Sequence, residues 1–186
     1  MSITDYKTNR KWSDRFNPRI QEICSRNIIL PVNIIIAPYE DDALRNTDLF
    51  AMSAGDKRIA CRMRRPEYLK NYANEFTITC KIPGMPKVEL DKLLEGWGDF
   101  FFYGFSNQDE KDIARWFIGD LHAFRGYYYR KKKELPKGIP PGSYRKKPDG
   151  SGDFLSFKLR QMPDNFIIAC SWQKEKQQKR QLTIEF

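Results

Sequence analysis

Arg-Ile-Ala-Cys-Arg-Met-Arg at 58–64 and Glu-Phe-Thr-Ile-Thr-Cys-Lys at 75–81 are the two stretches that decide the fold of this chain. In both, apolar and polar side chains alternate, which is typical of a β-strand with one buried face. A further strand is expected at 47–54, and Gly55-Asp56 is a suitable hairpin turn after it. We therefore expect a sheet at the centre of the fold.

The segments around these strands predict helices and one more strand. A helix is expected to begin near Pro18, and a short helix is expected at 87–94. The run at 100–105 is almost wholly apolar, as in a strand covered on both faces. Apolar residues at helical spacing, with acidic residues before them, predict a long helix over 108–130. The expected fold class is α/β, a small mixed β-sheet flanked by helices.

Length and composition indicate a single domain over 1–186. The chain is 40% hydrophobic and 14% aromatic, which is enough for a packed core and excludes disorder for most of its length. The sequence predicts a core at about 13–125, a mobile basic arm rich in Pro and Gly at about 130–152, and C-terminal strands at 153–186. Residues 1–11 are polar and are expected to be loose.

The charge of the chain favours a polyanionic partner. Its 33 Lys and Arg residues exceed 24 Asp and Glu residues, for a formal net charge of +9. Basic side chains that neutralise phosphates release counterions, so nucleic acid is the expected partner. A basic surface that is simply solvated is the alternative.

The sequence also favours a cytoplasmic protein without a zinc site. No apolar run approaches the roughly 20 residues of a membrane span, and the first residues lack a signal-peptide pattern. The 4 cysteines form no C-x-x-C pair and there is 1 histidine, which argues against zinc. Cysteines within apolar runs are expected to be buried thiols in a reducing compartment.

Acidic residues near the first expected strand can bind a hard divalent cation. Asp48 lies at the strand start, and Asp42 can supply a second carboxylate if the segment before it folds back. Glu89 and Lys92 lie one helical turn apart in the expected short helix. Carboxylates that hold Mg²⁺, together with a lysine, can activate water for attack on a phosphodiester. The alternative is that these residues occupy turns and helix ends on a solvated face.

The order of helix, Asp-bearing strand, hairpin strand, third strand, short helix and buried strand resembles the core of the PD-(D/E)XK nuclease-like superfamily. Thr47-Asp48-Leu49, the strand from Arg58 and Glu75-Phe76-Thr77-Ile78 resemble proteins of this kind from bacteriophages and mobile elements. The resemblance covers roughly 13–125. It implies a restriction-endonuclease-like core with a C-terminal extension, Asp48 as a ligand of Mg²⁺, and hydrolysis of DNA, in the host cytoplasm if a phage encodes the protein.

The second strand departs from the pattern of that family, which has an acid, one spacer and a lysine. Here these positions are Ala60, Cys61 and Arg62, and an arginine does not readily accept a proton. In one alternative, Glu89 and Lys92 replace the missing pair, with Arg62 beside them. In another, the protein is catalytically inactive and binds nucleic acid, or binds a host defence protein as an inhibitor. A third alternative is a structural protein of the particle.

Aromatic and basic side chains follow one another near the end of the expected long helix. Tyr128 precedes Arg130, Lys131, Lys132 and Lys133, which places rings able to stack on bases beside cations. Arg64 is a further expected nucleic-acid contact, from the second strand. The alternatives are that tyrosines pack on the helix, that lysines are solvated, and that the strand arginines pair with the acidic residues at 40–42.

Overall fold

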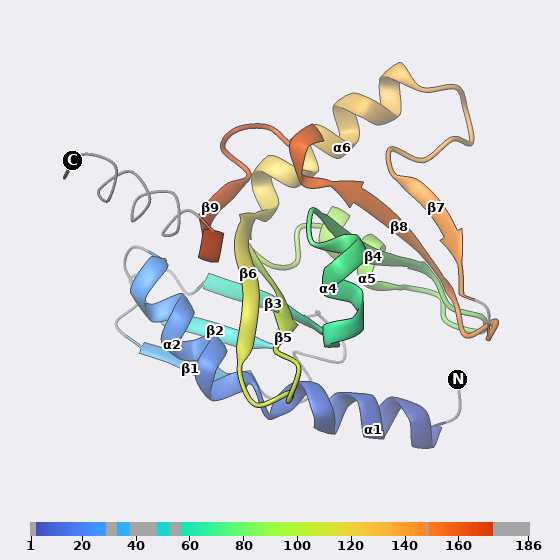
Figure 1. Ribbon diagram of the computed structural model, residues 1–186. Helices are drawn as coiled ribbons and strands as arrows, with labels where there is room; N and C mark the ends of the chain where they lie inside the picture. Colours follow the sequence, from blue (N-terminus) through green and yellow to red (C-terminus); the bar gives the residue numbers. More distant parts are fainter. Residues whose placement is uncertain (1–2, 29–32, 38–47, 53–56, 148, 173–186) are drawn as a thin grey trace, which may run out of the picture.

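The computed structural model describes residues 3–28, 33–37, 48–52, 57–147 and 149–172. The chain forms a mixed α/β structure with two sheets (Figure 1). The larger, six-stranded sheet has the order β1-β2-β3-β5-β6-β9, and the smaller has the order β4-β8-β7. The strands of the larger sheet are β1 (Asn33–Ile36), β2 (Leu49–Met52), β3 (Lys57–Arg64), β5 (Phe100–Ser106), β6 (Ile113–Asp120) and β9 (Ile167–Cys170). Those of the smaller sheet are β4 (Glu75–Lys81), β7 (Ser143–Lys146) and β8 (Asp153–Lys158).

Helices cover both faces of the larger sheet. They are α1 (Ile3–Asp14), α2 (Asn17–Asn27), α4 (Leu69–Tyr72), α5 (Glu89–Leu94) and α6 (Leu121–Glu134), with short 3-10 turns at Pro66–Tyr68 and Leu159–Gln161. None of the helices in the described ranges is both long enough and apolar enough to cross a membrane.

One parallel pair makes the larger sheet mixed. β3 runs parallel to β5, whereas the other neighbouring strands of this sheet are antiparallel. A parallel neighbour requires a crossover connection, because a tight turn can only reverse the chain. Here the crossover contains α4, β4 and α5, so it also contributes a strand to the smaller sheet. The end of β3 thereby lies beside the smaller sheet, where the candidate site forms.

The α2 face of the larger sheet buries a compact apolar cluster. Ile20 and Ile23 of α2 pack with Ile59, Met63 and Phe102 from β3 and β5. The helix begins near Pro18, as predicted, since proline fits the first turn where its missing N–H needs no partner. The apolar residues of α2 recur at helical spacing, so they lie on one side of the helix. They cover the strand side chains that point to this face of the sheet, which come from alternate residues.

The opposite face packs against α5, α6 and the smaller sheet through aromatic rings. Phe76 of β4 lies at the centre of this cluster and stacks on Phe157 and Phe166, with ring centroids 5.3 Å apart in both pairs. Gly119 of β6 makes room for one of these rings, since a Cβ there would lie 2.7 Å from Cζ of Phe166. Both sheets therefore share one apolar core.

The predicted strands at 57–64 and 100–105 are confirmed, the first with its alternation and the second with burial on both faces. Ile59 and Met63 of β3 contribute to the cluster under α2, whereas Ala60 contributes to the aromatic cluster. The predicted hairpin of the first two strands is also confirmed, because β2 and β3 are antiparallel neighbours. Its proposed turn lies outside the described residues.

The predicted helix over 108–130 is wrong for its first half. Ile113–Asp120 is strand β6, which pairs with β5, and α6 begins only at Leu121. Asn107 Oδ1 accepts hydrogen bonds from the backbone amides of Lys111 and Asp112, so the acidic segment is a hairpin turn and not a helix start. The actual cap of α6 is Asp120, whose side chain accepts from the amides of the first turn.

Three other expectations are corrected. The sheet is not a single small one, because the strand at 75–81 belongs to the second sheet. The expected mobile arm at 130–152 contains the end of α6 and strand β7. The N-terminal residues expected to be loose form α1. In each case a partner distant in sequence supplies the packing or pairing that orders the segment.

Candidate functional site

A buried ion pair joins the larger sheet to α5. The guanidinium of Arg62, on β3, donates to Oε2 of Glu89, and the side chain of Glu89 is only 9% exposed. The backbone N–H of Thr79, on β4, donates to the same oxygen at 2.8 Å. Arg62 also donates to Oγ1 of Thr79 at 3.2 Å and to Oγ1 of Thr77 at 3.5 Å. These partners compensate a carboxylate that would otherwise be costly to bury.

Asp48 lies beside the same part of β3. It directly precedes β2, and its Oδ2 accepts the backbone N–H of Cys61 at 2.5 Å. Because Glu89 bonds to Arg62, two of the three predicted metal ligands, Asp48 and Glu89, contact consecutive residues of one strand. The structure thus brings three of the four predicted catalytic residues, Asp48, Glu89 and Arg62, to β3.

The remaining predicted site residues do not complete a metal site in the described residues. Lys92 is in the last turn of α5, whereas the contacts described for Glu89 are with Arg62 and Thr79. Asp42 lies outside the described residues. Ala60, where the resemblance implies an acid, is 1% exposed and packs in the aromatic cluster. Within the described ranges, no three His, Cys, Asp or Glu side chains group in a way that could hold a metal ion.

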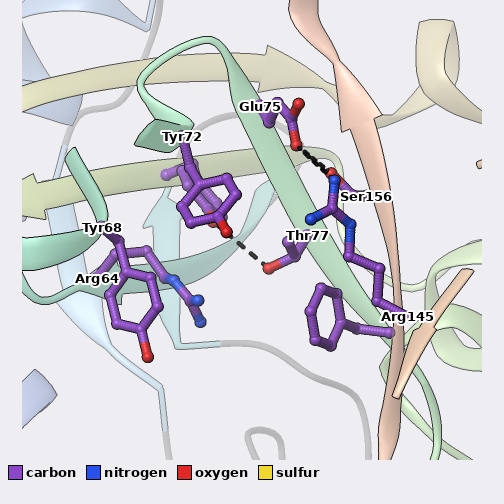
Figure 2. A pocket seen from close by; sticks show the side chains of 9 residues that line it. Arg64, Tyr68, Tyr72, Glu75, Thr77, Arg145 and Ser156 are labelled. Atoms are coloured by element: carbon purple, nitrogen blue, oxygen red, sulfur yellow. Dashed lines mark hydrogen bonds and ion pairs between the residues drawn. The ribbon is translucent and has the colours of Figure 1, made fainter. Parts of the chain in front are cut away.

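A pocket opens between the end of β3 and the smaller sheet (Figure 2). We call it the tyrosine–arginine pocket. It is lined by Arg64, Tyr68, Tyr72, Glu75, Thr77, Tyr103, Arg145, Phe154 and Ser156. Its volume is about 80 Å³, well below the roughly 300–1,000 Å³ of pockets for drug-sized ligands. It can therefore take one small ring or group and not a whole large ligand.

The rim of the pocket combines arginines with partly exposed rings. The guanidinium carbon of Arg64 lies 4.3 Å from the ring centroid of Tyr68, and that of Arg145 lies 5.8 Å from the ring centroid of Tyr72. The two tyrosine rings are 6.3 Å apart. Tyr68 and Tyr72 are 37% and 38% exposed, so both rings are accessible. Stacking on a ring orients each guanidinium without neutralising its charge.

Part of the pocket lining is polar. Ser156 Oγ donates to Oε2 of Glu75 at 2.6 Å, and the guanidinium of Arg145 lies 3.7 Å from the same oxygen (Figure 2). Thr77 Oγ1 and the hydroxyl of Tyr103 are 3.4 Å apart. Because Thr77 also contacts Arg62, the pocket and the Arg62–Glu89 pair form one continuous site.

Lys147 lies close enough to this site that the charged groups of the site change the pKa of its ammonium. Burial lowers the pKa of the Lys147 ammonium, and the positive charges of Arg62 and Arg64 lower the pKa further, whereas Asp149 and Glu89 raise it. We call Arg62, Arg64, Arg145 and Lys147 the basic cluster. A lysine whose charge is disfavoured in this way is stabilised by any anion that binds beside it.

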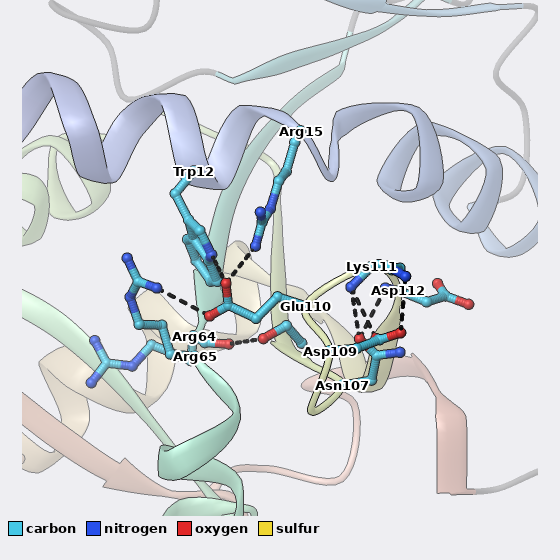
Figure 3. Close-up of polar contacts among 10 residues, drawn as sticks. Trp12, Arg15, Arg64, Arg65, Asn107, Asp109, Glu110, Lys111 and Asp112 are labelled. Carbon is cyan, nitrogen blue, oxygen red and sulfur yellow. Dashed lines mark hydrogen bonds and ion pairs between the residues drawn. The ribbon is translucent and has the colours of Figure 1, made fainter.

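Arg65, next in the chain, belongs to a different set of contacts. Its guanidinium donates to Oε1 of Glu110 at 3.0 Å, while Trp12 Nε1 and the guanidinium of Arg15 donate to Oε2 (Figure 3). Glu110 adopts a left-handed backbone conformation, with φ of 55°, in the β5–β6 turn. These bonds attach α1 to that turn, so we assign them a structural role.

The other predicted nucleic-acid contacts lie on α6. Tyr128 is 5% exposed and packs against Phe124, so its ring is unavailable for stacking, contrary to the prediction. Lys131 pairs with Glu134 at 2.7 Å. Arg130, Lys132 and Lys133 are exposed. No hydrogen bond or ion pair described for these four basic side chains connects them to the basic cluster.

The sequence analysis missed the tyrosines of the pocket. Tyr68 and Tyr72 are four residues apart and follow Pro66 directly after Arg64-Arg65, a spacing that places two rings on one side of a helical turn. Arg145 and Lys147 lay in the segment expected to be a mobile arm. Their position became apparent only with the pairing of β7 and β8.

Comparisons with known proteins give no family for this chain: no protein-family model matches it, and no curated protein matches it.

Proposed function

We propose that this protein binds nucleic acid through the tyrosine–arginine pocket and the basic cluster. One observation carries the proposal: Arg64 and Arg145 stack on two accessible tyrosines around one opening. Among the described residues Arg64 has no carboxylate partner. A guanidinium held on a ring suits a phosphate, which it can bind through two parallel hydrogen bonds.

The charges around the pocket support a polyanion. The four members of the basic cluster are opposed by the carboxylates of Glu75, Glu89 and Asp149. This leaves one positive charge in excess, within a chain of net charge +9. A phosphate beside Lys147 and Arg64 would offset the repulsion between them. Phosphate contacts of this kind supply most of the affinity of proteins for nucleic acids.

One observation favours a second candidate function, Mg²⁺-dependent hydrolysis of DNA by a fold similar to that of the PD-(D/E)XK nucleases. Asp48 and Glu89 contact consecutive residues of β3. Magnesium held there would polarise a phosphate and activate water. The ion would compete with Arg62 for Glu89. The buried Ala60 supplies no further ligand, so binding without cleavage is the primary proposal.

Equilibrium binding of labelled oligonucleotides, single-stranded and duplex, tests the primary proposal. We expect Arg64→Ala and Lys147→Ala each to weaken binding about 10-fold and to reduce the dependence of log Kd on log salt by about one unit. Arg130→Ala makes the same change of charge on α6 and is the matched control. Thermal melting of each variant checks folding.

Two results would contradict the proposal. One is the absence of oligonucleotide binding by the wild-type protein at low salt. The other is an equal loss of affinity in Arg130→Ala, which would indicate a diffuse attraction. Incubation of the same duplex with Mg²⁺, for the wild type and Asp48→Ala, tests the second candidate, which requires cleavage by the wild type alone.

A further inference from the structure

We infer that the tyrosine–arginine pocket takes one unstacked base of a single strand, and that it prefers a base with an exocyclic amino group. Tyr68 and Tyr72 provide the stacking surface, while Arg64 and Arg145 bind the flanking phosphates. This inference rests on the proposed function, because it specifies which form of nucleic acid the same site takes.

The accessible rings support a base as the occupant. Most large aromatic side chains near the site are buried, as Phe76 and Tyr103 are, whereas Tyr68 and Tyr72 remain more than a third exposed. Each lies beside an arginine, so the rim alternates rings and cations. Proteins that bind single strands combine these two features, since bases stack on rings while cations follow the backbone. Such stacking contributes about 1–3 kcal/mol per base.

The carboxylate of Glu75 disfavours a phosphate as the group bound inside the pocket. Glu75 lines the pocket, and its side chain is 18% exposed. Both contacts described for this carboxylate, from Ser156 and Arg145, are to Oε2. A phosphate inside the pocket would be repelled by the carboxylate, whereas an amino group of cytosine or adenine can donate to it. The hydroxyls of Thr77 and Ser156 are further partners for a base edge.

The size of the pocket favours a single strand. Its 80 Å³ can admit part of one nucleotide but not a stacked pair. In a duplex the faces of the bases are covered by their neighbours, and extrusion of a base costs a few kcal/mol. A base in a single strand is already free to enter. The same site should therefore bind single strands more tightly than duplexes of equal length.

Fluorescence anisotropy with 12-nucleotide homopolymers of dC, dA and dT, with the ribonucleotide series and with duplexes tests this inference. We expect single strands of either sugar type to bind at least about 5-fold more tightly than duplexes. Tyr68→Leu and Tyr72→Leu should each lose about 5- to 150-fold in affinity for single strands, with little change for duplexes. Glu75→Gln should reduce the preference for C and A over T. Tyr129→Leu, which changes an exposed tyrosine on α6, is the matched control.

The possible failures are distinguishable. If single strands and duplexes bind equally, and the tyrosine variants bind like the wild type while Arg64→Ala is impaired, the base pocket is wrong and the proposed function stands. If dT binds as tightly as dC and dA, the amino-group preference is wrong. If the wild type binds no oligonucleotide, both proposals are wrong. Unchanged melting temperatures of the variants ensure that lost binding reflects the pocket.

Discussion

The two faces of the larger sheet have different chemistry, although the same strands supply both. Under α2 the sheet buries aliphatic side chains with a few rings, such as Phe102 and Trp116. On the other face the rings of β4, β5, α6 and β8 form a continuous aromatic cluster. The polar site lies beside this second face, where Arg62 and Arg64 project from the end of β3 toward the smaller sheet.

This difference indicates a division of roles. The α2 face is closed by a helix and buries an apolar cluster that stabilises the fold. The other face is closed by a separate sheet, and the junction between two sheets leaves space for a pocket lined by side chains from both. A large aromatic core keeps the junction rigid, because rings bury much area and make specific edge and face contacts.

The largest expected effect comes from removing the ring at the centre of the aromatic face. Phe76→Ala should reduce the free energy of unfolding by about 5 kcal/mol, and Phe102→Ala on the α2 face by about 3 kcal/mol, both within the range for buried phenylalanine. The difference follows from the ring contacts of Phe76, which add to its burial. These contacts are with Phe101, Tyr103, Phe117, Phe124, Phe157 and Phe166. Urea denaturation measures both variants, and an equal or reversed order would contradict the comparison.

A second prediction uses alkaline pH to weaken the α2 face. Burial raises the pKa of the Cys24 thiol from 9.0 to about 12. Between these pH values the thiol of the unfolded chain loses its proton, whereas the thiol of the folded protein keeps it. The contribution of Cys24 to the free energy of unfolding is therefore fully present below pH 9 and falls as pH rises. The expected loss is about 1.4 kcal/mol per pH unit. Denaturation of the wild type and Cys24→Ala from pH 8 to 10.5 measures the slopes, and parallel slopes would show that Cys24 has no such role.

The smallest expected effect concerns the attachment of α1. The hydrogen bonds from Trp12 and Arg15, and the charge of Arg65, lower the pKa of Glu110 below its ordinary 4.5. The contribution of the Glu110 carboxylate to the free energy of unfolding is therefore present above pH 4.5 and is lost as pH falls through the lowered pKa. Compared at pH 7 and pH 3, Glu110→Gln should lose less stability on acidification than the wild type. Identical losses in thermal melting would contradict this assignment.

The strands with simple alternation could be predicted from the sequence. β3 and β4 alternate apolar and polar side chains, with Ala60 as an exception in β3, and β5 is almost wholly apolar because both of its faces are covered. The segment containing β6 could not be assigned in this way. Trp116, Phe117 and Leu121 fit a helical spacing as well as a strand followed by a helix, and pairing with β5 decides between them.

The site was predictable only in part, because its members come from separate elements spread along the chain. Asp48, Glu89 and Arg62 could be chosen by residue type and by the resemblance to a nuclease core. The ion pair between Arg62 and Glu89 depends on the placement of α5 against β3, which no local pattern specifies. The contribution of Arg145 depends on the pairing of β7 with β8, and the sequence of the β7 segment suggests a loop.

The pairing of β4 with β8 has a consequence for the order of folding. Glu75 lies opposite Lys158, so one wall of the pocket is synthesised long before the other. Until β8 is available, the ring of Phe76 and the side chain of Ile78 lack their cover, and the pocket does not exist. Pairings of such long sequence separation form late and leave apolar surface exposed in intermediates. The pocket therefore belongs to the completed fold, and any activity that depends on it reports complete folding.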